Sequence, residues 1–386
     1  MQRIFLIGAG FIARQHALAA ASLSADGLEV ELHVVDVDAR ALSSFADEFP
    51  SAIVHSEVGE MLAAPRFLDD VAVVATPPFT HYALADAALA AGFHVLCEKP
   101  LAMNSDEARK LAATARELGL VLESCDSRFR SVPATQRAAQ IVAGTQLGGP
   151  YHVTFRNKAR RSRSGIDFQP ESAWFRDPAR SGGGVLMDWG PYDIAVLDEL
   201  FTPVRVDVVH AWEGYPRTEG AFADETARAE HHVGATLRLT TDAGQVIAVD
   251  YERAACTHGA ESSLVEIEGS TGAVRWDWLD WLGDRVVLET DDGGVPQETV
   301  EHHPVVDAGF HARPLRELVQ WLADEVDSRI RTDRAEFTFS WLRAIAATTA
   351  DGTPRAIVRQ VTDGEQDPTL PQTTPVASLI PRGTPA

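Results

Sequence analysis

Short apolar runs separated by longer amphipathic stretches fill the first 125 residues. The apolar runs predict six strands, at residues 3–8, 29–35, 53–55, 71–75, 93–97 and 121–123. These runs are apolar almost throughout, which is typical of strands covered by helices on both faces of a parallel sheet. Between them, helical spacing of apolar positions predicts helices at 11–21, 40–49, 58–63, 81–92 and 105–118. Strands alternating with helices predict an α/β domain with a doubly wound parallel sheet at residues 1–125.

From residue 151 the pattern changes to an alternation of apolar and polar positions. It predicts strands at 151–155, 205–209, 234–239, 246–251, 263–267 and 285–289. Alternation indicates a mainly antiparallel sheet with one covered and one open face, in an α+β domain at residues 151–362. Predicted helices at 314–326 and 337–349 return to cover this sheet or the first domain. A loop and a helix at 126–150 link the domains, and the Pro-rich tail at 363–386 is expected to be disordered or loosely draped.

Composition and charge narrow the function classes. The 386-residue chain carries a formal net charge of −22, which argues against nonspecific binding to nucleic acid or to anionic membranes. Its three cysteines, Cys97, Cys125 and Cys256, are scattered and form no CxxC pair, so neither a disulfide framework nor a metal site is predicted. The N-terminus lacks the layout of a signal peptide and no apolar run reaches membrane-spanning length, so a reducing cytoplasm is the expected location.

A glycine motif follows the first predicted strand directly. Gly8, Gly10 and Ala13 form the pattern GxGxxA at the head of the first predicted helix. Gly8 permits a tight turn, Gly10 lets the backbone approach a pyrophosphate, and Ala13 is small where helix meets strand. The free N–H groups at the start of this helix, at Phe11 and Ile12, suit a diphosphate. The motif predicts a dinucleotide-binding Rossmann domain.

An acidic residue ends the second predicted strand. Asp36 stands where a carboxylate accepts hydrogen bonds from the adenosine ribose and repels a 2′-phosphate, so NAD is favoured over NADP. Its separation from Gly10 is longer than the usual ~20 residues, and a lengthened loop at 22–27 is expected to account for the excess. Arg40 could receive a 2′-phosphate, but a surface helix residue is the favoured interpretation.

Two proline-containing turns end other strands of the first domain. Thr76-Pro77-Pro78 forms a stiff turn that could lie against the nicotinamide ribose. His81, which opens the next helix, is a candidate cofactor contact, although a capping or packing role is favoured.

Glu98-Lys99-Pro100 ends the strand at 93–97. Pro100 cannot donate to a ladder and restricts Lys99 to an extended conformation, so the strand stops there. Open α/β sheets bind ligands at the carboxyl ends of their strands, which makes Glu98 and Lys99 candidate cofactor contacts and Lys99 a candidate catalytic residue. The alternative is a solvated loop lysine paired with Glu98.

The second domain holds one comparable stretch. Gly182-Gly183-Gly184 permits close approach of the backbone, and the helical pattern after it carries Asp188 and Tyr192, four residues apart and so expected on one helix face. A glycine-rich turn capping a packed helix, with Tyr192 a buried aromatic, is the structural alternative.

Together these motifs resemble the Gfo/Idh/MocA oxidoreductases, the family of glucose–fructose oxidoreductase and inositol dehydrogenase. The resemblance covers residues 1–350 and rests on the GxGxxA motif with His16, Thr76-Pro77-Pro78 with His81, Glu98-Lys99-Pro100, Gly182-Gly183-Gly184 and Asp188-x-Gly190-x-Tyr192.

The resemblance implies a Rossmann domain and an open-faced antiparallel sheet domain with the substrate between them. Lys99 then reaches the substrate hydroxyl, and Asp188 assists. Many relatives have a histidine at the position of Tyr192, and the tyrosine variant is similar to the glucose–fructose oxidoreductase and dihydrodiol dehydrogenase branch. Ala195 replaces a further acid common in the family, so an inositol-type contact is not expected. Relatives associate through the open sheet face, which implies a homodimer or homotetramer.

A mechanism follows for hydride transfer between nicotinamide and a carbinol carbon. Tyrosine ordinarily has a pKa near 10, and a lysine ammonium within about 4–6 Å would lower that pKa. The hypothesis is that Tyr192 is the general acid/base and Lys99 its activator and the substrate polariser. Lys99 acting alone as the base is the rival.

Two residue clusters have open interpretations. A basic run comprises Arg156, Lys158, Arg160, Arg161 and Arg163. It could receive an anionic substrate such as a phosphorylated sugar, although a solvated loop or a subunit contact is favoured.

A second cluster comprises Trp276, Trp278 and Trp281. Sheet packing or a subunit interface is favoured over sugar stacking.

Three functions remain at this stage. The first is an NAD-dependent dehydrogenase or reductase of a sugar, polyol or cyclic alcohol. The second is a redox-neutral glycosidase or lyase that uses NAD transiently, and the third is a non-catalytic NAD-binding regulator. The presence of both Lys99 and Tyr192 argues against the third.

Overall fold

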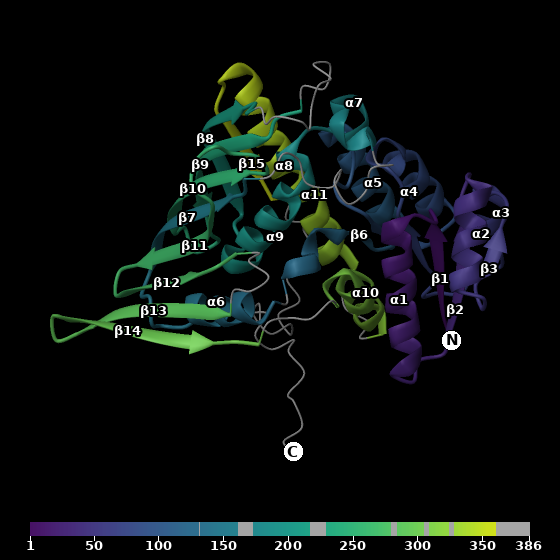
Figure 1. Cartoon of the computed structure of the whole chain (residues 1–386), viewed down its shortest axis with the longest axis horizontal. Helices are drawn as coiled ribbons and strands as arrows, with labels where there is room; N and C mark the ends of the chain where they lie inside the picture. The colour runs from purple at the N-terminus through teal and green to yellow at the C-terminus, as the bar shows by residue number, and fades with distance from the viewer. Residues whose placement is uncertain are drawn as a thin grey trace.

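The computed structural model describes residues 1–130, 132–160, 173–216, 229–278, 284–304, 309–323 and 328–359. Two domains lie side by side, each built on its own sheet (Figure 1). Among the described residues, no helix is both long and apolar enough to cross a membrane.

The first domain is a six-stranded sheet in the order β3-β2-β1-β4-β5-β6, with every pair parallel. Its strands are β1 (Gln2–Ile7), β2 (Val30–Val35), β3 (Ile53–His55), β4 (Val71–Val74), β5 (His94–Cys97) and β6 (Leu122–Ser124). Its helices are α1 (Phe11–Ala25), α2 (Ala39–Glu48), α3 (Val58–Leu62), α4 (His81–Ala90) and α5 (Ser105–Leu118). The predicted doubly wound parallel fold is confirmed.

The boundary of α1 differs from the prediction. Residues 22–25 continue the helix and only Asp26 and Gly27 turn, with Gly27 at φ +95°. Ala19, Ala20 and Leu23 stay buried, so packing on the sheet carries the helix past the serines that suggested a loop. The long spacing between Gly10 and Asp36 therefore comes from one more helical turn.

The second domain is a nine-stranded sheet in the order β14-β13-β12-β11-β7-β10-β9-β8-β15. Its strands are β7 (Pro150–Lys158), β8 (Arg205–Gly214), β9 (His232–Thr240), β10 (Val246–Ala254), β11 (Ser262–Gly269), β12 (Gly272–Trp276), β13 (Arg285–Asp292), β14 (Val295–His302) and β15 (Arg355–Val358). All described pairs are antiparallel except β7 with β10. The predicted mainly antiparallel sheet is confirmed, and β12, β14 and β15 add to the six predicted strands.

Helices cover the face of this sheet that looks toward the first domain (Figure 1). They are α6 (Pro133–Ala143), α8 (Val185–Asp188), α9 (Gly190–Phe201) and α11 (Ser328–Asp351). The short α7 (Pro178–Ser181) precedes α8, and α10 (Arg313–Ala323) packs on α1. The opposite face is open: along β10, Val246, Ala248 and Asp250 are exposed while Ile247 and Val249 are buried.

A buried carboxylate ties α9 to the sheet behind it. Asp193 is fully buried and accepts hydrogen bonds from the Tyr251 hydroxyl (2.9 Å), Arg253 Nε (2.8 Å) and Trp278 Nε1 (2.7 Å). Trp278 is buried in this packing, as is Trp276. Trp281 lies outside the described residues. Because Tyr192 precedes Asp193, this network also fixes Tyr192.

The Asp193 network predicts a large stability effect. Asp193→Asn leaves the buried Arg253 guanidinium without its counter-ion, which should cost about 3–5 kcal/mol of unfolding free energy. Urea unfolding followed by tryptophan fluorescence measures the change. Asp207→Asn, which breaks an exposed pair with Arg205, should cost below about 1 kcal/mol. Equal losses in the two variants would contradict the assignment of Asp193 as the structural anchor of α9.

Candidate active site

The glycine turn lies between β1 and α1 at the carboxyl edge of the sheet. Gly8 has φ +114°, and a Cβ there would lie 2.6 Å from the Ala75 carbonyl oxygen, so only glycine fits. A Cβ on Gly10 would meet no atom within 4 Å, so the start of α1 faces open space. Phe11, the first residue of α1, is 51% exposed. Exposed N–H groups at a helix start, beside a turn that only glycine permits, fit the diphosphate of a dinucleotide.

Asp36 lies at the end of β2 beside this turn. Its carboxylate accepts hydrogen bonds from the backbone N–H groups of Ala9 (2.7 Å) and Asp38 (2.8 Å). Asp38 in turn caps α2 by accepting a hydrogen bond from the backbone of Arg40. These contacts hold Asp36 next to the glycine turn, where a ribose would add its hydroxyl groups to the remaining lone pairs.

His81 links the two proline-containing turns. It is fully buried, with Nε2 2.7 Å from the Thr76 carbonyl oxygen and Nδ1 2.8 Å from the Pro100 carbonyl oxygen. Burial lowers the pKa of His81, and the hydrogen bonds to the two carbonyl oxygens offset part of this effect. The ring therefore fixes the relative position of the turn after β4, which includes Pro77, and the turn after β5.

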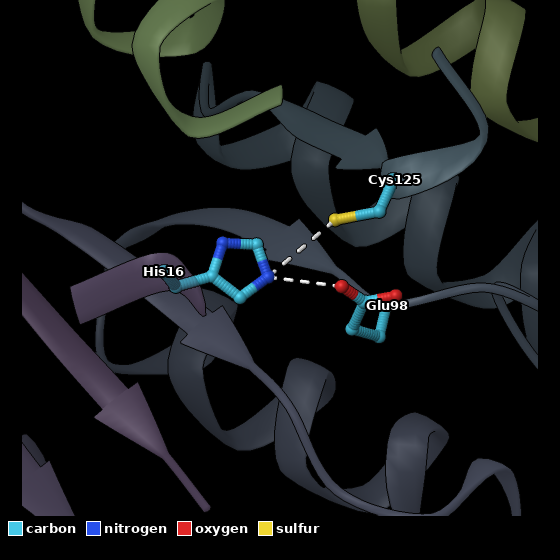
Figure 2. Close-up of side chains that lie close together, drawn as sticks. All are labelled: His16, Glu98 and Cys125. Atoms are coloured by element: carbon cyan, nitrogen blue, oxygen red, sulfur yellow. Dashed lines mark hydrogen bonds and ion pairs between the residues drawn. The ribbon is translucent and has the colours of Figure 1, made fainter. Parts of the chain in front are cut away.

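Glu98 is the centre of a buried hydrogen-bond cluster. Its Oε1 accepts from His16 Nε2 on α1 (2.9 Å) and from an Arg128 guanidinium nitrogen (2.5 Å) (Figure 2 draws His16, Glu98 and Cys125). Burial alone would raise the pKa of Glu98, but Arg128 and His16 hold that pKa well below its usual range. Glu98 is therefore a carboxylate fixed from two sides.

The side-chain atoms of His16, Glu98 and Cys125 that could bind a metal ion lie within 4.8 Å of one another. The scattered positions of the cysteines in the sequence did not predict this grouping. Cys125 Sγ is 4.0 Å from His16 Nε2 (Figure 2). Burial raises the pKa of the Cys125 thiol, and Glu98 Oε1 already accepts hydrogen bonds from His16 and Arg128. The group holds Glu98 in place through hydrogen bonds.

Lys99 reaches across to the second domain. Its Nζ donates to Asp188 Oδ1 (2.9 Å) and to the Asp188 carbonyl oxygen (2.8 Å). Burial works to lower the pKa of Lys99, but Asp188 and Tyr192 raise it, so the side chain is an ammonium at neutral pH. Nζ lies 5.2 Å from the centroid of the Tyr192 ring. The structure thus brings Lys99, Asp188 and Tyr192 together from two domains.

Tyr192 has a second cationic partner that sequence reasoning missed. The Arg128 guanidinium donates to the Tyr192 hydroxyl oxygen (2.7 Å) while it pairs with Glu98. The expectation that Lys99 lowers the pKa of Tyr192 below its ordinary value is wrong. Burial raises that pKa, and Arg128 and Lys99 only partly offset the effect. The phenol is therefore protonated at neutral pH.

The prediction that Asp188 and Tyr192 lie on one helix is wrong. Asp188 ends α8, and Tyr192 is in the first turn of α9, after a break at Trp189. Glu230 organises this region by accepting hydrogen bonds from the N–H groups of Gly184 (2.7 Å) and Leu186 (3.1 Å). A Cβ on Gly184 would lie 1.9 Å from the Glu230 carbonyl oxygen, so the third glycine is needed for this packing.

The described part of the basic run lies on β7 and just beyond it. Arg156 and Lys158 pair with Glu252 on the neighbouring strand β10. The side chain of Arg160 donates to the backbone of Gly259 and His258. Arg161 and Arg163 lie outside the described residues. The three described residues are thus occupied within the sheet domain and do not line the Lys99 site.

Comparison with known proteins decides the family. Residues 2–124 match the Gfo/Idh/MocA oxidoreductase model, described as an NAD-binding Rossmann fold, and residues 135–275 match the family's C-terminal domain. The chain belongs to the Gfo/Idh/MocA oxidoreductase family. Its first domain is an NAD-binding Rossmann domain.

Two relatives of this chain are named as sugar dehydrogenases. D-apiose dehydrogenase of Paraburkholderia graminis is 27% identical over 274 residues, which cover 70% of this chain and 66% of that enzyme. D-glucoside 3-dehydrogenase of Escherichia coli is 33% identical over 228 residues, or 58% of this chain and 61% of the relative. Each match thus spans less than two thirds of the relative's length.

Solved structures of the family share the whole two-domain fold. A levoglucosan dehydrogenase in complex with NADH and L-sorbose superimposes with a TM-score of 0.75, covering 93% of this chain and 99% of that one. At 18% identity, this likeness shows the fold alone.

The carboxylate of Asp36 is expected to make the protein prefer NADH over NADPH. Asp36→Asn keeps the acceptor for the Ala9 N–H but removes the charge that repels a 2′-phosphate. The ratio of the NADPH and NADH dissociation constants, from fluorescence titration, should fall by about tenfold, or about 1.4 kcal/mol. Asp47→Asn, an exposed change on α2, should leave the ratio unaltered. An unchanged ratio in Asp36→Asn would show that the carboxylate does not select NAD.

Proposed function

We propose that this protein is an NAD-dependent dehydrogenase or reductase that transfers a hydride between nicotinamide and a secondary alcohol or ketone carbon of a sugar, polyol or cyclic alcohol. The observation that carries the proposal is the meeting of an ammonium, Lys99, with a phenol, Tyr192, at the carboxyl edge of an NAD-binding sheet. The names of the two sugar dehydrogenases reported above support a sugar-type substrate.

The residues that would hold the dinucleotide follow the edge of the sheet. Gly8, Gly10 and the N–H groups of Phe11 and Ile12 would face the diphosphate, and Asp36 the adenosine ribose. Thr76 and Pro77, positioned by His81, and Glu98 would lie along the nicotinamide half. The bound cofactor supplies the hydride acceptor for oxidation and the hydride donor for reduction.

Lys99 polarises the substrate oxygen in the proposed mechanism. Asp188 keeps Lys99 charged and aims its ammonium, and an ammonium beside a carbonyl or hydroxyl oxygen stabilises the negative charge that develops there. The Lys99 and Asp188 side chains are 14% and 12% exposed, so a substrate oxygen can replace part of their solvent.

Tyr192 moves the proton. In reduction, its protonated phenol donates to the substrate oxygen, and Arg128 stabilises the phenolate that is left through its hydrogen bond to the same oxygen. In oxidation, the phenolate takes the hydroxyl proton. Because burial holds the pKa of the free phenol high, Arg128 and Lys99 together must make the phenolate accessible. Lys99 acting alone would instead need to lose its proton, against the raising effect of Asp188.

The assignment of Tyr192 is tested by turnover on a panel of sugars, polyols and cyclic alcohols, followed by NADH fluorescence. Tyr192→Phe should lower kcat by about 10²–10⁴-fold on any active substrate, because a positioned acid/base is lost. The NADH dissociation constant should not change. Tyr151→Phe, exposed on the open sheet face, is the matched control and should keep full turnover. Near-normal turnover in Tyr192→Phe would remove Tyr192 from the mechanism.

A further inference from the structure

A short segment that follows β14 in the second domain lies on the cofactor edge of the first domain. The 3₁₀ turn η4 (Phe310–Ala312) and α10 after it contact α1, and α10 runs beside α1 in Figure 1. The ring of His311 meets the ring of Phe11 edge-on, with centroids 6.3 Å apart. Phe11 is the first residue of α1, so His311 lies beside the helix start that faces the diphosphate.

His311 also lies close to Arg128, because η4 contacts the 3₁₀ turn η2 (Cys125–Phe129) that carries this arginine. The charges that act on its ring are those of Arg128, Glu98, His16 and Lys99, and burial together with Arg128 lowers its pKa to about 3. The imidazole is therefore neutral at neutral pH, and each nitrogen can donate or accept according to the tautomer.

One nitrogen of this ring has no partner within the described structure. His311 Nδ1 is buried and makes no hydrogen bond. A buried polar atom without a partner is unfavourable, and a ligand that supplies the missing hydrogen bond gains from it. Packing of the preceding residue restricts the position of His311. The ring of Phe310 packs on that of Phe129 (centroids 5.3 Å apart), and Phe129 packs on Tyr192 (centroids 4.6 Å apart).

We propose that His311 binds the nicotinamide half of the dinucleotide, with Nδ1 hydrogen-bonding its carboxamide or its ribose. The proposal rests on the proposed function, because it takes the reacting ring to lie near Lys99. A dinucleotide that runs from the helix start at Phe11 toward Arg128 and Lys99 would pass His311, whose ring packs on Phe11 and whose element η4 contacts the segment that carries Arg128. The nicotinamide half offers donors and acceptors there. η4 is then a wall of the cofactor site supplied by the second domain.

The experiment compares two probes by titration calorimetry. NADH carries the nicotinamide half, whereas ADP carries only the adenosine and the diphosphate. His311→Leu should weaken NADH binding by about 3- to 10-fold, the range for one neutral hydrogen bond, and leave ADP binding unchanged. His311→Asn, whose amide can take the place of Nδ1, should recover most of the NADH affinity. His302→Leu, exposed on β14, is the matched control and should match the parent for both probes.

Each outcome decides a separate point. Equal NADH affinity in His311→Leu and the parent would overturn the assignment. An equal loss for ADP and NADH would also overturn it, because the residue would then act on α1 or on folding. If the parent protein bound no NADH at all, the proposed function would fail before the role of His311 was tested.

Discussion

The ion pair between Arg128 and Glu98 is the interaction on which the site depends. Both residues are buried, and the same guanidinium that pairs with Glu98 donates to the Tyr192 hydroxyl. Glu98 adjoins Lys99 in the turn after β5, so one arginine sets the distance between the lysine of the first domain and the phenol of the second. A buried pair of this kind contributes little net stability, because desolvation offsets its attraction, but loss of either partner leaves an uncompensated charge. The pair therefore matters because it fixes the positions of Glu98 and Tyr192.

Each of three buried or half-buried cations in and behind the site has a carboxylate partner. Lys99 is balanced by Asp188, Arg128 by Glu98, and Arg253 by Asp193 behind α9. Tyr192 lies between the first two pairs as the neutral member, and burial keeps it protonated. This arrangement without excess charge is compatible with the neutral sugar or polyol proposed above as the substrate. It also agrees with a basic run whose described residues are engaged elsewhere.

Local sequence signals predicted where the motifs of the site lie in the fold, but not the long-range contacts that hold the site residues. The GxGxxA turn and Glu98-Lys99-Pro100 are contiguous motifs at strand ends, so their position at the carboxyl edge could be inferred from strand–helix order. Arg128, Glu230 and His311 could not be found in this way. Each acts on a residue at least 30 positions away, as Arg128 does on Glu98, and has no pattern around it. The break at Trp189 and the sign of the Tyr192 shift depend on packing and burial, which spacing does not specify.

The central claim is that Lys99 and Tyr192, held by Arg128 and Asp188, act on one substrate oxygen as a unit. A double-mutant cycle on kcat/KM with Lys99→Met, Tyr192→Phe and the double variant tests this most directly, because residues that act together show non-additive losses. The account predicts that the double variant loses about as much activity as the more damaged single variant. Losses that multiply, as for two independent groups, would contradict it.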